Sequence, residues 1–322
     1  MRKGFFKKMV ALVLAVVTTM TMFTGCGGAG STSASTKSIT IQGGNTEGDL
    51  DPAGVALGMF IQYSRLCLEP LITYDSDGKV SKAMAESYEE SSDGLTWTFH
   101  LRKDAKWSDG SAVTSADFVN TIKRSLDGKT SKSIYADMLS PIVGATEAYA
   151  GTASVDNVGV TAPDDYTIEF KLVKPCSYFL KLIAMQCCYP SKAGIATNEN
   201  ETWYTDPKTN LANGAFYMTE YVQGQYYKLK KNPNYYDADK VYLEDITVKF
   251  IDDATAAVSA YKTNEVDFAT NLPAYVMSEY QGKSDLVLQP NITTRFMLFN
   301  VTKAPFNNDK VRRAISMALS RA

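Results

Sequence analysis

Histidine is almost absent from this sequence of 322 residues, in which His100 is the only one. Catalysis by a histidine base therefore has a single candidate, and direct capture of a metal ion by histidines is disfavoured. His100 falls on the outward side of a predicted strand, where a surface histidine is the favoured interpretation. The sequence also lacks a Ser-based nucleophile elbow and a phosphate-binding loop. These absences argue against the most familiar hydrolases and nucleotide-dependent enzymes.

Cysteine is scarce, with five in the chain. Four of them follow the N-terminal region, and their spacing matches no metal-site pattern. The neighbours Cys187 and Cys188 could bond to each other only with strain, and they lie in the apolar run LIAMQCCYP. We therefore expect buried free thiols at Cys67, Cys176, Cys187 and Cys188, with no metal and no cofactor. A redox or metal role for these cysteines is the weaker alternative.

Long apolar runs are missing except near the N-terminus, and none is long enough to span a membrane. Residues 1–8 carry four positive charges and no acid, and nine uninterrupted apolar residues follow at 9–17. A basic segment followed by a short apolar segment is typical of a secretory signal peptide. We assign the signal peptide to residues 1–25, and the protein is therefore expected to be exported.

Small residues precede Cys26 in the order Thr24, Gly25, Cys26, which is typical of a lipoprotein cleavage site. Cys26 would become the lipid-carrying N-terminus, although an ordinary signal peptide with a bystander Cys26 is the alternative. Residues 26–37 are rich in Gly, Ala, Ser and Thr, which predicts a flexible tether. The expected location is the outer face of the cytoplasmic membrane, in the cell envelope, with the folded body extracellular or periplasmic.

Excess positive charge is lacking as well. Without residues 1–25 the chain has 29 Lys and Arg against 35 Asp and Glu, a net charge of −6 with histidine neutral. An acidic chain is a poor partner for nucleic acid, so no nucleic-acid partner is expected. The length of about 285 residues that remains after the tether suffices for two lobes with separate cores.

Aromatic residues gather in one short stretch, DGLTWTFHLRKDAKWSDG at 93–110. Alternation over 96–101 places Trp97, Phe99 and Leu101 on one face of a strand. The Asp93–Gly94 pair predicts a hairpin turn, so residues 88–91 should pair antiparallel with that strand. We expect Trp97 and Trp107 to lie in a core, with stacking on a ligand as the alternative.

A helix is predicted to follow this stretch. Thr114 and Asp117 have the spacing of a capping box, and Phe118, Ile122 and Leu126 then recur on one helical face. The strand, the turn and the helix should pack as one unit.

Helical and strand-like patterns alternate irregularly along the rest of the chain, which predicts an α/β protein with mixed sheets. The remaining predicted helices are 55–68, 178–185, 253–263 and 309–320. The remaining predicted strands are 38–42, 71–74, 155–160, 166–172, 215–221, 225–230, 246–251, 266–269 and 295–300. A short extended or irregular connection is expected at 80–87. Because the chain stops directly after the last helix, we expect the sequence to be cut short.

Several motifs carry a resemblance to a known family. The most specific is the stretch 85–126, with its segments DGL, FHLR, WSDG and TSADFV. Shorter motifs agree, namely LDP at 50–52, NGAF at 213–216, NPNY at 232–235 and APFN at 304–307. The chain resembles the solute-binding lipoproteins of ABC importers of the peptide/nickel type, and especially the oligopeptide-binding proteins. Tyr236 stands where such proteins usually carry tryptophan.

The resemblance implies the fold of a type II-like periplasmic binding protein, with two lobes and an extra small subdomain. It assigns lobe 1 to 38–70 and 191–297, and the small subdomain to 71–190. Residues 298–322 would complete a hinge strand and supply the first helix of lobe 2. Most of lobe 2 would be missing from this chain.

The resemblance also implies a function. A receptor that is not an enzyme, expected to be a monomer, would capture an oligopeptide in the cleft between the lobes through main-chain hydrogen bonds. It would then deliver the peptide to the permease subunits of an ABC transporter. The alternatives are another solute, such as a nickel chelate, haem, an oligosaccharide or a signalling peptide. A secreted hydrolase and a purely structural surface lipoprotein are more distant alternatives.

The resemblance implies candidate binding residues, but no catalytic residue and no metal ligand. Main-chain groups of Ala56, Leu57 and Gly58 would face the ligand, and the Tyr135 hydroxyl could bond to its main chain. A packed surface tyrosine is the alternative at Tyr135. Asn213 would line the cleft or, as the alternative, form a turn. The acid that holds a peptide amino group in such proteins belongs to lobe 2 and is not in this chain.

Overall fold

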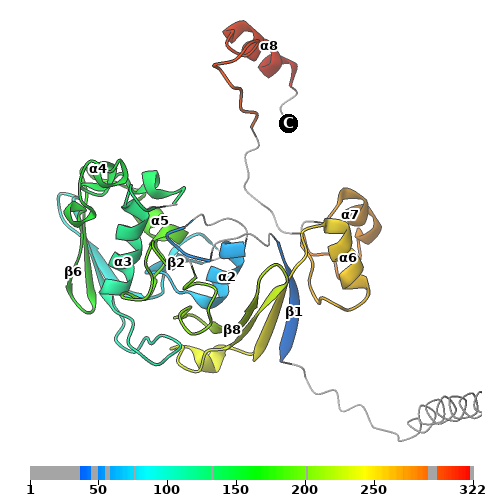
Figure 1. Cartoon of the computed structure of the whole chain (residues 1–322), viewed down its shortest axis with the longest axis horizontal. Helices are drawn as coiled ribbons and strands as arrows, with labels where there is room; N and C mark the ends of the chain where they lie inside the picture. The colour runs from blue at the N-terminus through cyan, green and yellow to red at the C-terminus, as the bar shows by residue number, and fades with distance from the viewer. Residues whose placement is uncertain are drawn as a thin grey trace, which may run out of the picture. The chain divides into compact units, whose positions relative to one another are not determined.

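The computed structural model describes residues 37–44, 50–54, 59–75, 77–131, 133–200, 202–270, 272–288 and 296–319. The predicted signal peptide and Cys26 lie outside these ranges, as do Ala56, Leu57 and Gly58. The described residues up to Leu272 form one compact unit, and those from Pro273 onward form a second. Figure 1 shows the elements of both units.

The first unit contains a mixed sheet of four strands in the order β1-β10-β9-β8. β1 runs parallel to β10, and the other pairs are antiparallel. Helix α2 (Met59–Cys67) packs beside this sheet, where the ring of Tyr63 meets that of Tyr227 edge to face at 6.1 Å (Figure 1). The strands are β1 (Ser38–Gly43), β8 (Phe216–Val222), β9 (Tyr226–Lys231) and β10 (Asp245–Phe250).

A second four-stranded sheet is antiparallel throughout, in the order β4-β5-β7-β6. Its first two strands form the predicted hairpin, with Tyr88 opposite Phe99, and Gly94 in the turn has a φ of +70°. The strands are β4 (Ala85–Glu90), β5 (Thr96–Leu101), β6 (Val160–Asp164) and β7 (Thr167–Lys171). A separate small hairpin joins β2 (Ile72–Tyr74) to β3 (Val80–Lys82).

The predicted aromatic core of this sheet is confirmed. Trp97, Phe99 and Leu101 are buried, whereas His100 on the opposite face is exposed. Phe99 contacts Phe170 edge to face at 5.6 Å. Each such side chain contributes about 1.5–3 kcal/mol through burial. Trp107 is fully buried as well, so both tryptophans belong to the core.

Helix α3 (Ser115–Leu126) follows the sheet hairpin as predicted and buries Phe118, Ile122 and Leu126. At its start the Asp117 carboxylate accepts the backbone N–H of Thr114 at 2.9 Å. The same carboxylate oxygen accepts the indole N–H of Trp107 at 2.9 Å. One buried acid therefore caps the helix and anchors the tryptophan.

Shorter helices complete the described part of the chain. In the first unit these are η1 (Ala136–Leu139), α4 (Ala145–Tyr149), η2 (Val155–Asn157), α5 (Phe179–Ile183), η3 (Gln186–Cys188), η4 (Ala238–Lys240) and α6 (Ala254–Lys262). In the second unit they are α7 (Ala274–Tyr280) and α8 (Asp309–Ala318).

Two predicted segments differ in the structure. The predicted strand 155–160 is a turn of η2 up to residue 157, because the Ser154 hydroxyl accepts the backbone N–H of Asp156 and favours a local turn. The predicted strand 266–269 is reduced to a single bridge between Ile41 and Phe268. At 80–87, where a short extended or irregular connection was predicted, the chain contains the extended β3 and the start of β4.

The predicted hinge strand 295–300 is also wrong for its described residues. Residues 296–300 form no strand, and Phe296 and Leu298 are highly exposed. A strand exists only where a neighbouring strand pairs with its backbone groups, and no strand pairing is found for these residues in the described part of the chain. Alternation of apolar residues alone was therefore not sufficient here.

The two four-stranded sheets are joined through the turn after β5. The backbone N–H of Ser108 donates to the Ala212 carbonyl at 2.8 Å, and the Asn234 amide donates to the Ser108 carbonyl at 3.1 Å. Arg124 of α3 adds an ion pair to Asp51, which lies in the segment after β1. The bonds of Ser108 in the WSDG motif and the Arg124–Asp51 pair connect residues far apart in the sequence and hold the parts of the first unit together.

The four described cysteines are free and buried, as predicted. Burial raises the pKa of the Cys67 thiol far above its usual range. Within the described ranges, no helix is both long and apolar enough for a membrane span.

Candidate functional site

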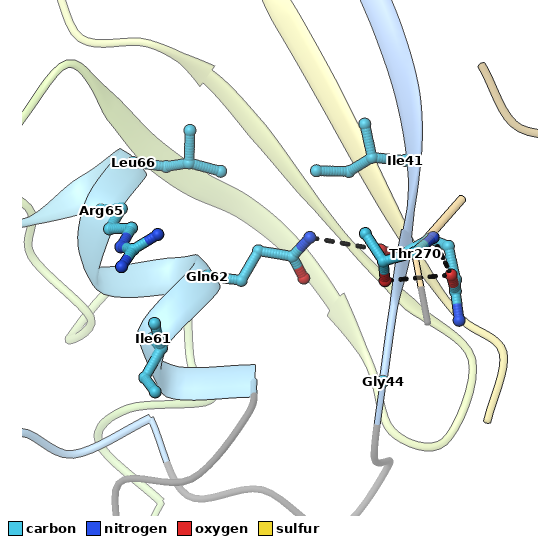
Figure 2. A pocket seen from close by; sticks show the side chains of 8 residues that line it. Ile41, Gly44, Ile61, Gln62, Arg65, Leu66 and Thr270 are labelled. Atoms are coloured by element: carbon cyan, nitrogen blue, oxygen red, sulfur yellow. Dashed lines mark hydrogen bonds between the residues drawn. The ribbon is translucent and has the colours of Figure 1, made fainter. Parts of the chain in front are cut away.

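A hollow of about 380 Å³ opens between the end of β1 and helix α2. Figure 2 shows the helix on one side and the strand on the other. Ile41, Ile61 and Leu66 supply its apolar wall. Concave sites of roughly 300–1,000 Å³ with apolar walls and a few polar groups are typical of small-ligand binding.

The polar wall of the hollow is fixed by Gln42, which is 3% exposed. Its side-chain amide donates to the Ile251 carbonyl at 2.7 Å, and its side-chain oxygen accepts the backbone N–H of Thr270 at 2.7 Å. From α2, the Gln62 amide donates to the Gln42 backbone carbonyl at 3.2 Å (Figure 2). These bonds tie β1, α2 and the segment at Thr270 into one rigid rim.

Arg65 brings a positive charge to this hollow from the last turn of α2. Its side chain is exposed, and it forms no ion pair with a carboxylate of any residue that the structure describes. Burial raises the pKa of Tyr189, and the charge of Arg65 opposes that rise. Among the described residues, the guanidinium therefore has no acid that competes with an anion from solution.

The predicted wall at Ala56, Leu57 and Gly58 lies outside the described residues. Tyr135 is half-buried against the core at the start of η1, where its backbone N–H donates to the Ser133 hydroxyl at 3.3 Å. It does not line the hollow at Arg65. Its role toward a ligand stays a prediction.

Asn213 is buried, with 1% of its surface exposed. Its side-chain oxygen accepts the backbone N–H of Glu69 at 2.9 Å, and its amide donates to the Glu69 carbonyl at 3.1 Å. At Gly214 an added Cβ would lie 2.7 Å from the carbonyl carbon of Cys67. The Asn213–Gly214 pair therefore holds the chain that leaves α2, and its contact with a ligand stays a prediction.

A cluster of charged and aromatic residues lies around Glu69, in the segment that follows α2, and was not predicted. The Tyr235 hydroxyl donates to the Glu69 carboxylate at 2.7 Å, and the Arg102 guanidinium lies 3.2 Å from the centre of the Tyr236 ring. Burial raises the pKa of Glu69, and the bond from Tyr235 opposes it. Tyr236, which stands where tryptophan is usual in the proteins that this chain resembles, thus provides an aromatic surface for Arg102.

Sequence reasoning also missed the residues of the hollow, namely Gln42, Gln62, Arg65 and Thr270. A pair of glycines at 43–44, directly after a predicted strand, was the one available signal. The bonds of Gln42 join residues up to 228 positions apart, which no local pattern reveals. In the described part of the chain, no three His, Cys, Asp or Glu side chains are grouped so as to hold a metal ion.

Comparison with known families gives one match over most of the chain. Residues 79–322 match the family described as "Bacterial extracellular solute-binding proteins, family 5 Middle".

Individual relatives agree with this match. The chain is 32% identical over 298 residues to the periplasmic oligopeptide-binding protein OppA of Escherichia coli, which covers 91% of this chain and 54% of OppA. It is 32% identical to the probable deoxycholate-binding periplasmic protein YgiS of the same organism, over 85% of this chain and 51% of YgiS. The chain thus spans about half the length of the curated relatives it matches.

A solved structure supports the predicted fold. The murein tripeptide binding protein MppA of Escherichia coli superposes with a TM-score of 0.80 at 29% identity. The match covers 88% of this chain and 56% of MppA. The relatives are solute-binding proteins rather than enzymes, as predicted. The predicted resemblance is confirmed, and the chain belongs to family 5 of the bacterial extracellular solute-binding proteins.

Proposed function

We propose that this protein is an extracellular lipoprotein that captures oligopeptides and delivers them to a membrane ABC transporter. The observation that carries the proposal is the 32% identity to an oligopeptide-binding protein over 91% of the chain. The four-stranded mixed sheet and the small antiparallel sheet are consistent with a binding lobe and a subdomain packed on it.

In this proposal lobe 1 comprises 38–70 and 191–297, and the small subdomain comprises 71–190. The ligand would lie between lobe 1 and a second lobe that begins near residue 298. A receptor for many peptides must grip the main chain and leave room for varied side chains, as in strand addition. Main-chain groups of Ala56, Leu57 and Gly58 and the hydroxyl of Tyr135 would supply that grip. Asn213 would support this wall by holding Glu69 in place.

The membrane anchor is part of the proposal. Signal peptidase would cleave before Cys26. The lipid on Cys26 and the tether 26–37 would then keep the folded body at the outer face of the cytoplasmic membrane. Substitution of Cys26 by alanine should release the protein into the medium or periplasm and abolish labelling by radioactive fatty acid. Retention of the label in this variant would contradict the anchor.

A second candidate ligand is a carboxylated steroid. YgiS, described as a probable deoxycholate-binding protein, matches this chain at the same identity as OppA. The family match therefore does not by itself choose between a peptide and a bile acid.

Isothermal titration calorimetry of the complete gene product tests the two ligands. We expect saturable binding of peptides from a pool of mixed di- to pentapeptides, and weaker or no binding of deoxycholate. Binding of deoxycholate alone would favour the second candidate. A catalytic loss of peptide during the titration would contradict both, and mass spectrometry of the recovered ligand checks this.

A further inference from the structure

We propose that the hollow between β1 and α2 binds a carboxylate on an apolar group of the ligand, with Arg65 as its cationic partner. The inference rests on the proposed function, because it names a chemical requirement of the same ligand. Nothing in the comparisons assigns this hollow or Arg65 to a ligand.

The positive charge of the hollow comes from Arg65. Arginine presents a planar fork of N–H donors that matches a carboxylate, and charge-assisted bonds of this kind are stronger than neutral ones. Other arginines of the first unit have protein partners: Arg102 pairs with Asp104 at 2.7 Å, and Arg124 pairs with Asp51 at 2.5 Å. Arg65 has no carboxylate partner among the described residues and remains exposed at the hollow. An anionic group of a ligand could therefore bind it without displacing an acid of the described residues.

The wall beside Arg65 selects the group that carries the carboxylate. Leu66 follows Arg65 on α2, and Ile41 faces the helix from β1 (Figure 2). Burial of an apolar group of the ligand against this wall would stabilise the complex by about 25 cal/mol per Å² of apolar surface removed from water. A fully hydrated ion such as inorganic phosphate would leave that wall unused. The matching ligand is a carboxylate attached to an apolar group.

The rim is held rigid, so the hollow is formed before the ligand arrives. Gln42 is buried and uses its amide and its oxygen on the Ile251 carbonyl and on Thr270. Gln62 is held by its bond to the Gln42 backbone. A site that needs little ordering binds more tightly, because less conformational entropy is lost.

Two neighbouring glycines give a direct steric test of the hollow. At Gly44, which lines the hollow, an added Cβ meets no atom of the described residues within 4 Å. At Gly43 an added Cβ would lie 2.6 Å from the Val248 side chain. Gly44→Leu should therefore block the hollow and leave the fold stable, whereas Gly43→Ala should disturb the sheet itself.

A carboxylate on an apolar group can come from the C-terminus of a peptide, from an acidic side chain or from a bile acid. Three probes distinguish these sources. The first is a peptide with an apolar last residue, compared as the free acid and as the C-terminal amide. The second is the same amide with glutamate in place of an internal residue. The third is deoxycholate.

The experiment measures the Kd of each probe by calorimetry for wild type, Arg65→Gln, Arg65→Lys and Gly44→Leu. The exposed Arg313 of α8 supplies the control variant Arg313→Gln. For the probe that wild type binds, we expect Arg65→Gln to weaken binding about tenfold or more, which corresponds to one lost charge-assisted contact. Arg65→Lys should restore part of the loss, and Gly44→Leu should weaken binding with an unchanged Tm.

The pattern of results identifies the source. If wild type prefers the free acid and Arg65→Gln removes that preference, the carboxylate is the peptide C-terminus. If the glutamate probe shows this dependence instead, the carboxylate is an acidic side chain. Binding of deoxycholate alone, with dependence on Arg65, supports the hollow and rejects the peptide function.

Peptide binding that is equal in wild type, Arg65→Gln and Gly44→Leu overturns the inference and leaves the peptide function intact. If wild type binds none of the three probes, both proposals are overturned.

Discussion

The guanidinium of Arg124 and the carboxylate of Asp51 form a buried ion pair with two hydrogen bonds, of 2.7 and 2.5 Å. The two residues are 73 positions apart and belong to different parts of the first unit. Trp203 lies 5.5 Å from the guanidinium and adds a cation–π contact. This pair ties the LDP motif to helix α3.

Removing one partner of this pair should be strongly destabilising, because the other charge would stay buried without compensation. Asp51→Asn should lower the free energy of unfolding by about 3–5 kcal/mol. Urea denaturation followed by tryptophan fluorescence measures the change. The control is Asp104→Asn, since the Asp104 side chain is 62% exposed in its pair with Arg102 and should contribute about 0–1 kcal/mol. Equal losses in the two variants would contradict the importance of burial.

Substitution by phenylalanine should have effects of different size at the two core tryptophans. The Trp107 indole N–H donates to the Asp117 carboxylate, whereas the Trp97 indole N–H is buried without a partner among the described residues. Trp107→Phe should therefore destabilise the fold by about 1–3 kcal/mol more than Trp97→Phe, since a bond to a charged group is lost. Thermal and urea unfolding of both variants check the difference. A larger loss for Trp97→Phe would contradict this assignment.

The Asn213 side chain should stabilise the fold whatever its role toward a ligand. Asn213→Ala would leave the backbone N–H and carbonyl of Glu69 without partners, at a cost of about 1–3 kcal/mol for each group left unsatisfied. Protonated Asn213→Asp keeps an acceptor oxygen and an O–H donor, so below the pKa of the new carboxyl group it should cost less than alanine. At neutral pH the ionised carboxylate is a buried charge without a donor, so it should cost more than alanine. Urea unfolding of the two variants at two pH values measures this. Unchanged stability in Asn213→Ala would contradict the structural role.

Glu69 should make stability depend on pH. Its pKa is raised by burial above the ordinary value, so the folded protein holds the proton more tightly than the unfolded chain. The stability that Glu69 contributes is therefore fully present below the unfolded pKa, near 4.3 in model peptides. It is lost as the pH rises through the raised folded pKa.

The variant Glu69→Gln removes this titration and retains an acceptor for the Tyr235 hydroxyl. We expect its free energy of unfolding, relative to wild type, to rise as the pH increases from about 4 toward neutrality. Urea denaturation at half-unit steps of pH measures the difference. A flat difference across this range would show that Glu69 does not titrate with folding.

Local patterns in the sequence were sufficient for most strands and for the packing of the small antiparallel sheet. Alternation over 96–101 correctly separated Trp97 and Phe99 from His100, because neighbouring side chains on a strand point to opposite faces. The capping residues Thr114 and Asp117 correctly marked the start of α3. These predictions depend on residues close together in the chain.

Predictions failed where the outcome depends on distant residues. The strand expected at 295–300 needs a pairing partner that local sequence does not reveal. The bonds of Asn213 to Glu69, 144 positions away, were not predicted, and its contact with a ligand stays a prediction. The hollow at Arg65 is formed by β1, α2 and Thr270 together, and only the folded chain brings them into contact.

The buried state of Cys67, Cys176, Cys187 and Cys188 has a practical consequence for studying motion in this protein. Maleimide reagents attack exposed thiolates, so these four thiols should stay unmodified while the chain is folded. A single cysteine introduced on the exposed face of α8, at Met317 for example, should then accept a fluorophore selectively. Modification of the native thiols would instead report local opening, and its rate as a function of added peptide would measure how far ligand stabilises the closed core.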